Sequence, residues 1–293
     1  MKAVLTPREF AEAIGVSESS VKRWVDNGEI SATRTAGGHR RVSLGDAAQY
    51  IRQHGLRLVR PEILGLSEVA AFRGRKPAGR DLEDRLFECL RAGAEDEARG
   101  LLLGLYLEGE SVAQIIDGPL RAAMARVGEL WTREPSGVFW EHRATQITMH
   151  SLVRLRALQN VASDAAVAVG GAAPGDRYML PSMAVATVLE AQGMRAVNLG
   201  ADTPIATLAL GVCDLDARLA WLSVSNASTP ARLRAEVIDL LPEFADRGTA
   251  LVVGGAEAKH LKLPSEDLLY VAGSMVELEA LVRGMRLAAS SAG

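Results

Sequence analysis

Hydrophobic residues change their spacing twice along the chain, and the changes divide it into three regions. Over residues 1–54 the apolar positions form short faces at helical spacing, interrupted by turn residues. Over residues 81–161 the helical spacing is sustained, whereas from residue 166 short apolar runs alternate with helical segments. Apolar residues three or four apart indicate amphipathic helices, and short apolar runs indicate buried strands. We therefore expect a small head, a helical bundle and a β/α domain, in that order.

The first region predicts a helix-turn-helix followed by a basic hairpin. Thr6-Pro7-Arg8-Glu9 combines an N-cap, a proline at the first helical position and the acid of a capping box, and Ser17 would cap a second helix over residues 18–26. The second helix of such a pair enters the major groove of DNA. Ile30 is expected to start a short strand, and residues 34–41 to form a hairpin tip whose arginines pair with phosphates. The predicted DNA-contacting residues are Ser19, Ser20, Lys22, Arg23, Arg34, His39, Arg40 and Arg41; the alternative for the last two is that they are solvated surface charges.

The second region predicts four helices with short connections. Glycine-rich or proline-rich breaks at Gly93, residues 109–111 and residues 134–137 separate segments whose apolar residues keep helical spacing. Four such helices form a bundle. The stretch before them, residues 73–80, is polar and rich in breakers, so we place the boundary of the head there.

The third region predicts a parallel sheet with helices on both faces. Its apolar runs lie at residues 166–169, 196–199, 219–223, 250–253 and 269–271, and helical segments follow them, beginning near Pro181, Pro204, Pro230, Ala256 and Met275. Ligands of open parallel sheets lie at the carboxyl ends of the strands. The loop over residues 175–181 and the later strand ends, which carry hydroxyls and a glycine pair, are therefore the expected ligand site. Gly170-Gly171 lacks the GxGxxG pattern of dinucleotide sites, and we interpret it as a tight turn.

Composition and charge narrow the setting of the protein. The hydrophobic fraction of 48% is ample for packed cores, and the net charge of -3 is uneven: residues 1–54 carry eight Lys/Arg and six Asp/Glu, which gives +2, and the remainder carries -5. The two cysteines, Cys89 and Cys213, belong to no CxxC or metal-spaced cluster. The chain has neither a basic segment followed by an apolar run at its start nor about 18 consecutive apolar residues. We expect a cytoplasmic protein without a membrane partner.

The candidate chemistry does not indicate an enzyme. The chain has no Ser/His/Asp set, Cys/His pair, metal cluster or P-loop, and its five histidines form no ligand motif. We therefore predict no catalytic residues and no metal site.

The head resembles a known class of regulators. The run VKRWVDNGEISATRTAGGHRRVS, residues 21–43, closely resembles the winged helix-turn-helix of MerR-type and excisionase-like transcriptional regulators. This resemblance implies binding to double-stranded operator DNA. One head of this size has a modest footprint, so specificity would need several heads on repeated half-sites. We therefore expect a homo-oligomer, either a dimer or a tetramer.

The remaining regions resemble light-sensing cobalamin regulators of the CarH/LitR type. The loop beginning at Asp176 resembles the Asp/Glu-x-His-x-x-Gly loop of cobalamin-binding domains, but Tyr178 stands at the histidine position and Pro181 at the glycine position. In the bundle, Trp131 is followed after nine residues by Glu141-His142, as in the cap that covers the upper face of the cofactor in these proteins. Photoreceptor members can carry a histidine directly after that tryptophan, where this chain has Thr132. Both expected imidazole ligands are absent, and Tyr178 would ligate cobalt only as a phenolate, which a pKa near 10 makes costly.

The resemblance implies a winged helix-turn-helix at residues 1–56, a linker at 57–80, a four-helix bundle at 81–163 and a flavodoxin-like β/α domain at 164–293. The implied ligand-binding residues are Trp131, Val138, Glu141, His142, Asp176, Tyr178, Ser223, Ser225, Gly254 and Gly255. From the residues alone, Trp131 is also consistent with a plain core position, and Glu141-His142 with a solvated helix start. The implied function is a transcriptional repressor controlled by cobalamin (adenosylcobalamin), with a light response, through a change of oligomeric state. Two alternatives remain open: a regulator that senses another tetrapyrrole, haem or a bilin, and a ligand-independent repressor whose sensor half serves assembly or binds protein partners.

Overall fold

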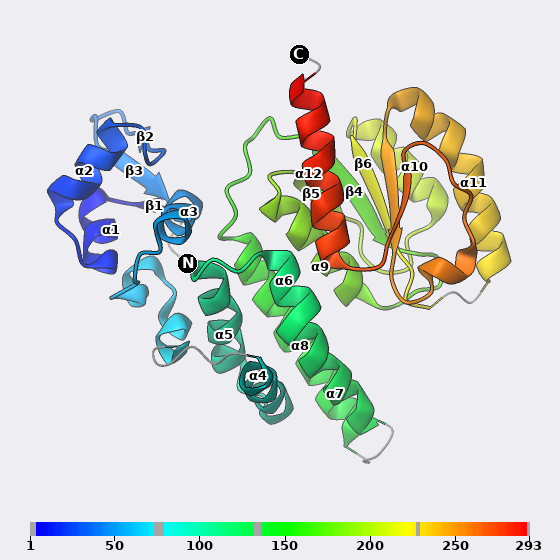
Figure 1. The fold of residues 1–293 in the computed structure, drawn as a ribbon, viewed down its shortest axis with the longest axis horizontal. Helices are drawn as coiled ribbons and strands as arrows, with labels where there is room; N and C mark the ends of the chain where they lie inside the picture. The colour runs from blue at the N-terminus through cyan, green and yellow to red at the C-terminus, as the bar shows by residue number, and fades with distance from the viewer. Residues whose placement is uncertain (1–3, 73–78, 132–135, 227–228, 292–293) are drawn as a thin grey trace. The chain divides into compact units, whose positions relative to one another are not determined.

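The computed structural model describes residues 4–72, 79–131, 136–226 and 229–291, and the chain divides into two compact units. The first unit, Met1–Asn160, holds the head and the bundle, and the second unit, Val161–Gly293, holds the sheet (Figure 1). None of the helices in the described ranges is long and apolar enough to cross a membrane.

The head is a helix-turn-helix with a wing, as predicted. Its elements are β1 (Val4–Leu5), α1 (Pro7–Ile14), α2 (Glu18–Asp26), β2 (Thr33–Arg34), β3 (Arg40–Ser43) and α3 (Leu44–His54). The capping box of Thr6 and Glu9 and the Ser17 cap are both present. The strand expected at Ile30 is wrong: Ile30 is a buried turn residue, and the wing strand begins at Thr33. The sequence pattern also missed β1, a two-residue strand that pairs antiparallel with β3.

The bundle has four long helices, the third of which is interrupted. Its elements are α4 (Arg80–Ala92), α5 (Glu95–Leu107), α6 (Val112–Ile115), the π turn η3 (Ile116–Leu120), α7 (Arg121–Trp131) and α8 (Gly137–Arg156). Pro119 lies inside η3, and Gly118 next to it has non-helical dihedral angles. Proline lacks an amide hydrogen and clashes with the preceding turn, which explains the irregular turn between α6 and α7.

The segment expected to act as a linker is packed over part of its length. Residues 57–72 contain two 3₁₀ turns, η1 (Pro61–Leu64) and η2 (Ser67–Phe72), in place of an extended chain. Leu64 and Leu66 are fully buried, and the amides of Val59 and Arg60 both donate to the carbonyl of Ala13 at the end of α1. This segment therefore joins the head to the bundle through apolar and backbone contacts. The rest of the polar hinge, residues 73–78, lies outside the described residues.

The second unit is a five-stranded parallel sheet of order β5-β4-β6-β7-β8. The strands are β4 (Val167–Ala172), β5 (Arg195–Asn198), β6 (Leu219–Ser223), β7 (Ala250–Gly254) and β8 (Leu269–Ala272); the helices are α9 (Met179–Ala191), α10 (Ile205–Asp214), α11 (Pro230–Arg247) and α12 (Met275–Ser291). In strand sequence the order is 2-1-3-4-5, the flavodoxin-like order, which confirms the predicted fold class. Residues near Ala256 form only the short 3₁₀ turn η4 (Ala258–Leu261) in place of the helix expected there.

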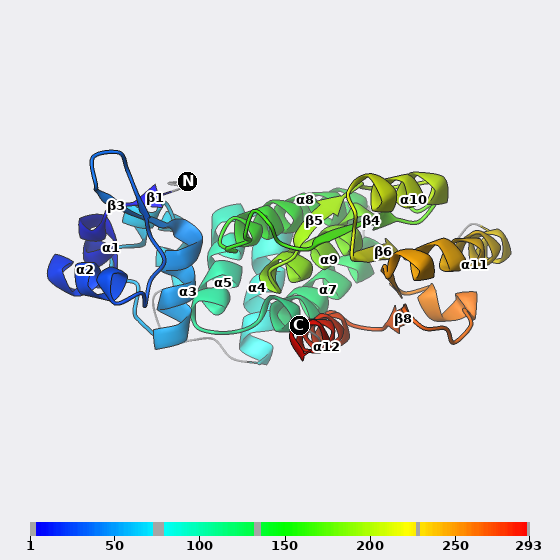
Figure 2. The ribbon, with the colours of Figure 1, turned by 90° about the horizontal axis from the view of Figure 1, so that it is seen from above.

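Helices cover both faces of this sheet (Figures 1 and 2). The core on one face joins Ala220 and Leu222 of β6 to side chains of α10 and α11. The opposite face carries α9 and α12, which pack on each other. Side chains alternate along a strand. Trp221 and Ser223 therefore point toward the face that α9 covers.

Candidate functional site

The outer face of α2 is the candidate surface for DNA. Val21 is fully buried and fixes the helix on the head, so Ser19, Lys22 and Arg23 on the other side are exposed. Ser20 is half-buried, because its amide and hydroxyl both contact the capping hydroxyl of Ser17. Lys22 forms an ion pair of 2.8 Å with Glu18 one turn earlier. Arg23, one of the four residues predicted on α2, is therefore an exposed cation, and the described contacts include no ion pair for it.

The wing is fastened to α2 by an arginine–carboxylate pair that the sequence did not predict. Arg40 on β3 donates from Nε and Nη2 to the carboxylate of Asp26 at the end of α2, at 3.0 Å and 2.8 Å to its two oxygens. The Arg40 side chain is only 24% exposed, whereas Arg34 on β2 is 61% exposed and lies 3.8 Å from Asp26. A paired carboxylate fixes a guanidinium and offsets its charge. Arg40 therefore positions the wing, and Arg34 presents the freer charge.

The wing tip is an exposed turn closed by hydrogen bonds between Thr35 and His39. The Thr35 amide donates to the His39 carbonyl, and the Thr35 hydroxyl accepts from the His39 amide. Arg41 is half-buried and donates to the carbonyl of Arg40. All the residues predicted to contact DNA therefore lie on α2 or on the wing, the two elements that such heads present to DNA.

The head docks on the bundle through Arg52 of α3. Its guanidinium lies 3.9 Å from the centre of the Tyr106 ring and donates to the Tyr106 carbonyl in the last turn of α5 and, at 2.9 Å, to the Glu110 carbonyl in the loop after it. A cation at a helix carboxyl end is favourable because the last carbonyls lack partners. The Tyr106 hydroxyl donates to Gln159 at 3.0 Å. Burial raises the pKa of the Tyr106 phenol, and the nearby Arg52 charge opposes the shift without cancelling it.

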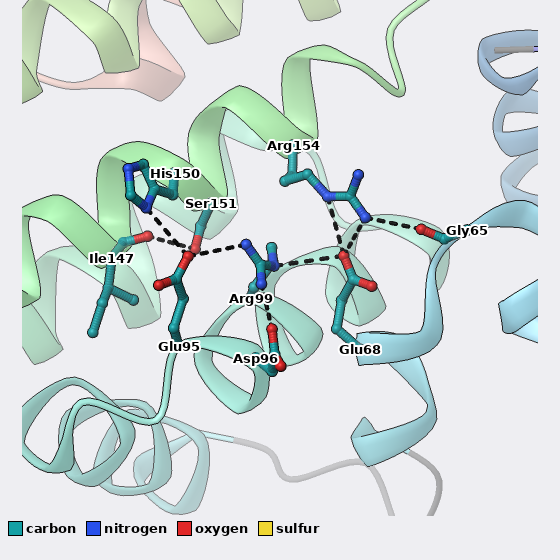
Figure 3. A network of polar contacts seen from close by, with 9 residues as sticks. All are labelled: Gly65, Glu68, Glu95, Asp96, Arg99, Ile147, His150, Ser151 and Arg154. Atoms are coloured by element: carbon teal, nitrogen blue, oxygen red, sulfur yellow. Dashed lines mark hydrogen bonds and ion pairs between the residues drawn. The ribbon is translucent and has the colours of Figure 1, made fainter. Parts of the chain in front are cut away.

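A second connection between the segment after the head and the bundle is a buried carboxylate between two arginines (Figure 3). Glu68 of η2 is 9% exposed, and its Oε1 accepts from Arg154 of α8 at 2.6 Å and lies 3.5 Å from Nε of Arg99 on α5. Arg154 also donates to the carbonyl of Gly65, and Arg99 donates to Glu95. Buried charges are stable only when paired and hydrogen-bonded. These bonds hold η2 between α5 and α8.

In the second unit, the loop after β4 is built around the carboxylate of Asp176. Asp176 is fully buried; its Oδ1 accepts from the Tyr178 amide at 2.9 Å, and its Oδ2 accepts from the amides of Ser225 and Asn226 at 2.6 Å and 3.3 Å. Asp202 supports the same loop by accepting from the Gly175 amide at 2.7 Å. Asp176 is therefore a clamp between the loops after β4 and β6, whose oxygens are used within the protein.

Tyr178, at the position of the cobalt-binding histidine in the resemblance, lies on the surface. It is 58% exposed, and Met179 beside it is 41% exposed. Two of the other strand-end groups are also open: Ser225 is half-buried and Gly255 is exposed with a positive φ of 107°. Ser223 is 2% exposed and lies 3.5 Å from the carbonyl of Gly171. Gly254 is half-buried at the end of β7. The structure thus places all six predicted groups of this unit at one edge of the sheet, with Asp176 and Ser223 facing inward.

Gly170-Gly171 is not a turn, contrary to our interpretation, because both residues lie inside β4. A Cβ on Gly170 would lie 2.3 Å from Cδ2 of Trp221 on the adjacent strand β6. Trp221 is 1% exposed, and its indole nitrogen donates to the hydroxyl of Ser182 on α9 at 3.0 Å. Ser182 in turn donates to Asn198 at 2.9 Å. The interior under α9 is therefore occupied by an indole that rests on a bare strand backbone.

The bundle residues predicted to cover a cofactor lie at the start of α8. Val138 is 46% exposed and His142 has a side chain 75% exposed, while Glu141 accepts from Thr145 at 3.0 Å and lies 3.6 Å from His142. The backbone of Trp131 ends α7, but its side chain and Thr132 lie outside the described part. Among the described residues no group of three or more His, Cys, Asp or Glu side chains is arranged to hold a metal ion.

Some groups at the sheet edge suit contact with a cobalamin-type ligand, and others do not. Its exposed loops offer Tyr178, Ser225 and Gly255 to the flat face of a ligand. A cavity beside Gly175 and Thr229 has a volume of about 170 Å³, below the roughly 300–1,000 Å³ of usual small-molecule sites. The buried groups predicted to meet a ligand's tail are already bonded within the protein. The residues present therefore suit contact at the surface and do not suit a deeply inserted group.

Comparisons with known proteins match the head and the bundle separately. Residues 4–55 match the family described as a helix-turn-helix domain, and residues 82–156 match the family described as a B12 binding domain. No curated protein matches the sequence. The chain therefore combines a helix-turn-helix domain with a bundle of the B12-binding type.

Similar solved structures extend the likeness to the second unit. The monomethylamine corrinoid protein of Methanosarcina barkeri is 17% identical with a TM-score of 0.54, over 71% of this chain and 100% of that chain. A cobalamin-binding protein from Desulfitobacterium hafniense is 17% identical (TM-score 0.36, 69% of this chain and 97% of that chain). The methanol:cobalamin methyltransferase complex MtaBC of M. barkeri is 18% identical (TM-score 0.31, 71% and 81%). The first of these likenesses supports a shared fold of bundle and parallel sheet.

Three functional features escaped the sequence: the Asp26 partner of Arg40, the buried Glu68 and the indole of Trp221. Asp26 and Glu68 carry no local signal, because their partners are distant along the chain. Trp221 carried one. A glycine inside a strand often marks a close approach by a neighbouring group, and Gly170 is such a glycine.

Proposed function

We propose that the protein is a transcriptional regulator whose head binds operator DNA and whose bundle and sheet sense a cobalamin-type ligand. The observation that carries the proposal is the succession, in one chain, of a helix-turn-helix domain and a bundle of the B12-binding type. The head is of the MerR type by its wing, and the regulator acts as a repressor. A DNA-binding head also favours a regulatory role over a catalytic one.

The contacts of the head support transmission of a signal to DNA. Arg52 and the Glu68 cluster join the head and its following segment to α5 and α8. A ligand that moves these helices therefore changes the placement of the head. One head presents one α2 and one wing, so tight operator binding needs two or more chains. We propose a homo-oligomer whose assembly depends on the ligand.

The residues that would hold a corrinoid lie at the carboxyl edge of the sheet: the exposed Tyr178 and Gly255 and the half-buried Ser225. Parallel sheets bind ligands at this edge. When bound, adenosylcobalamin supplies a cobalt–carbon bond that light can break. This chemistry is the basis for proposing a light response. The protein itself contributes a loop whose shape Asp176 fixes and a tyrosine in place of an imidazole.

The test measures DNA binding and ligand retention on the full chain. Fluorescence anisotropy with a labelled fragment of the protein's own promoter is recorded in darkness without and with adenosylcobalamin, and again after green light. Absorption after desalting reports retained corrinoid, and light scattering reports assembly. We expect retained corrinoid to change both DNA affinity and assembled mass. DNA binding that is indifferent to retained corrinoid would reject ligand control and leave the head assignment standing.

A double variant separates the two halves of the proposal. Arg40→Ala with Arg41→Ala should lose most DNA affinity because it removes the wing's attachment and one cation. It should retain corrinoid as well as the unaltered chain does. Unchanged DNA binding in this variant would reject the wing as part of the interface.

A further inference from the structure

The strongest unassigned feature of the second unit is the indole of Trp221. It lies on the α9 side of β6, is 1% exposed, and has the largest volume of any fully buried side chain among the described residues. Its nitrogen donates to Ser182 at 3.0 Å, and Ser182 passes the bond on to Asn198. A buried indole normally finds such a partner. Trp221 is therefore fixed at its polar tip as well as by packing.

The residue of β4 that faces the indole is Gly170, and there is no space for a side chain at this position. An added Cβ on Gly170 would lie 2.3 Å from Cδ2 and 2.5 Å from Cγ of Trp221, far inside van der Waals contact. Gly170 and Trp221 are paired in register on β4 and β6. Protein interiors are packed as densely as organic crystals, so two bicyclic rings do not fit where one is seated. The space between the sheet and α9 holds this ring and no second one.

The polar groups around this space are also satisfied internally. Ser223 follows Trp221 on the same face of β6 and is 2% exposed, and Asp176 accepts three backbone amides. A ligand base pushed in from the carboxyl edge would have to displace the indole and its bond to Ser182. Nothing else on this path offers a free buried donor or acceptor among the described contacts.

We propose that Trp221 fills, from within the protein, the place that a ligand's buried aromatic base would need, so that this unit accepts a corrinoid by its ring and excludes its nucleotide base. The inference rests on the proposed cobalamin-type sensing and specifies its chemistry. The corrinoid would then stay at the loops of Tyr178 and Gly255 and keep its own base-coordinated form.

The first experiment compares two corrinoids on the unaltered full chain. Equilibrium dialysis measures the Kd of cobalamin and of cobinamide, which has the same ring and lacks the nucleotide base. We expect the two Kd values to agree within about threefold, because the base adds no buried contact. The bound cobalamin should keep the absorption spectrum of its base-coordinated form at neutral pH. A preference for cobalamin of about tenfold or more, with a base-free spectrum, would overturn the proposal.

The second experiment needs no corrinoid and tests whether the Trp221 indole occupies a site for an aromatic base. If neither corrinoid binds in the first experiment, that outcome rejects the proposed cobalamin sensing and the acceptance of the ring with it. Trp221→Ala should open a cavity shaped for a bicyclic ring, and apolar cavities made by truncation bind small aromatic molecules. Adding free 5,6-dimethylbenzimidazole should therefore raise the Tm of this variant by several degrees, as a ligand of the folded state does. The same base should leave the unaltered chain unchanged. It should also leave the control Trp140→Ala unchanged, because Trp140 of α8 is only half-buried and its truncation opens no enclosed cavity.

A milder variant guards against loss of folding. Trp221→Leu removes less volume and should show a smaller rise of Tm with the base if Trp221→Ala does not fold. If the base raises the Tm of the unaltered chain, the space is open and the proposal fails. If the base leaves every folded Trp221 variant unchanged, the indole does not occupy a site for such a ring, and the proposal fails as well.

Discussion

The guanidinium of Arg40 on the wing holds the carboxylate of Asp26 at the end of the recognition helix, with contacts of 3.0 Å and 2.8 Å to its two oxygens. The pair joins the two elements that are predicted to contact DNA together. It also means that a wing arginine expected to pair with phosphate is already paired within the protein. An arginine that positions the wing and an arginine that pairs with phosphate would contribute differently to the salt dependence of DNA binding.

Arg40→Gln should weaken DNA binding while leaving its salt dependence nearly unchanged. Each phosphate contact contributes about 0.9 to the slope of log K against log salt concentration, and a cation paired with Asp26 contributes little. Arg23→Gln, which removes an exposed cation of α2, should lower the slope by about one. Anisotropy titrations at salt concentrations between about 50 and 200 mM would measure both slopes. Equal losses of slope in the two variants would contradict the positioning role.

Arg52→Ala should loosen the head from the bundle. The side chain makes charged hydrogen bonds to the end of α5 and a cation–π contact with Tyr106, so we expect a loss of about 2–3 kcal/mol in the stability of this interface. Hydrogen exchange should accelerate in α3 and at the end of α5. Arg232→Ala, an exposed ion-pair residue of the second unit, is the matched control and should change stability by less than about 1 kcal/mol. Unchanged protection of α3 would show that Arg52 does not hold the head.

Glu68→Ala should cost about 1–3 kcal/mol in the free energy of unfolding of the first unit. It removes the carboxylate partner of the half-buried Arg154, whereas Arg99 keeps Glu95 and Asp96, and a largely desolvated charge that loses its partner is destabilising. Urea unfolding followed by circular dichroism measures the loss. Combining Glu68→Gln with Arg154→Met should be milder than Glu68→Ala if buried charge is the cause. A double variant as unstable as the single one would indicate lost packing instead.

The first unit should lose stability above about pH 10. Burial raises the folded-state pKa of the Tyr106 phenol, so the unfolded chain releases this proton at a lower pH than the folded chain does. The contribution of Tyr106 is therefore fully present below about pH 10 and is lost as the pH rises through its folded pKa. Urea midpoints at pH 8 and pH 10.5 should fall less for Tyr106→Phe than for the unaltered chain. A residual fall is expected from Tyr50, whose pKa is also raised, first by burial and then by Glu29. Equal falls with and without the Tyr106 hydroxyl would contradict this origin.

Asp176→Asn should release the loop after β6. The amide that replaces Oδ1 or Oδ2 cannot accept from all three backbone donors, and each buried donor left unsatisfied costs about 1–3 kcal/mol. Exchange of the Ser225 and Asn226 amides should accelerate, whereas amides of β7 should keep their protection. Slow exchange at Ser225 in the variant would mean that Asp176 is not the clamp.

Local signals predicted much of the fold, and long-range pairs were beyond them. The capping box at Thr6, the Ser17 cap and the five apolar runs each depend on residues close in sequence, so their elements lie near the predicted positions. The strand predicted at Ile30 was wrong because a buried apolar residue after a helix gives the same pattern as the start of a strand. The residues predicted to contact DNA were assigned from the order of elements alone, and that assignment stays a prediction. The partnership of Arg40 with Asp26 and that of Glu68 with Arg154 depend on tertiary folding, which periodicity does not encode.

The predicted ligand site also shows which features local sequence signals predict and which features depend on tertiary packing. The resemblance placed Asp176, Ser223 and Gly255 at one sheet edge, which follows from strand topology. It did not reveal that Asp176 and Ser223 face inward, because burial depends on the side chains opposite. Trp221 was read as one more apolar residue of a strand, although Gly170 on the neighbouring strand indicated a large partner.

The contact between Gly170 and Trp221 also constrains how related sequences can diverge. An added Cβ on Gly170 would lie 2.2 Å from the backbone carbonyl oxygen of Trp221 as well as 2.3 Å from its indole. The backbone contact remains whichever side chain stands at position 221, so replacing Trp221 does not free position 170. Position 221 can therefore vary while glycine is kept at 170, and homologues that have lost the indole should still carry that glycine.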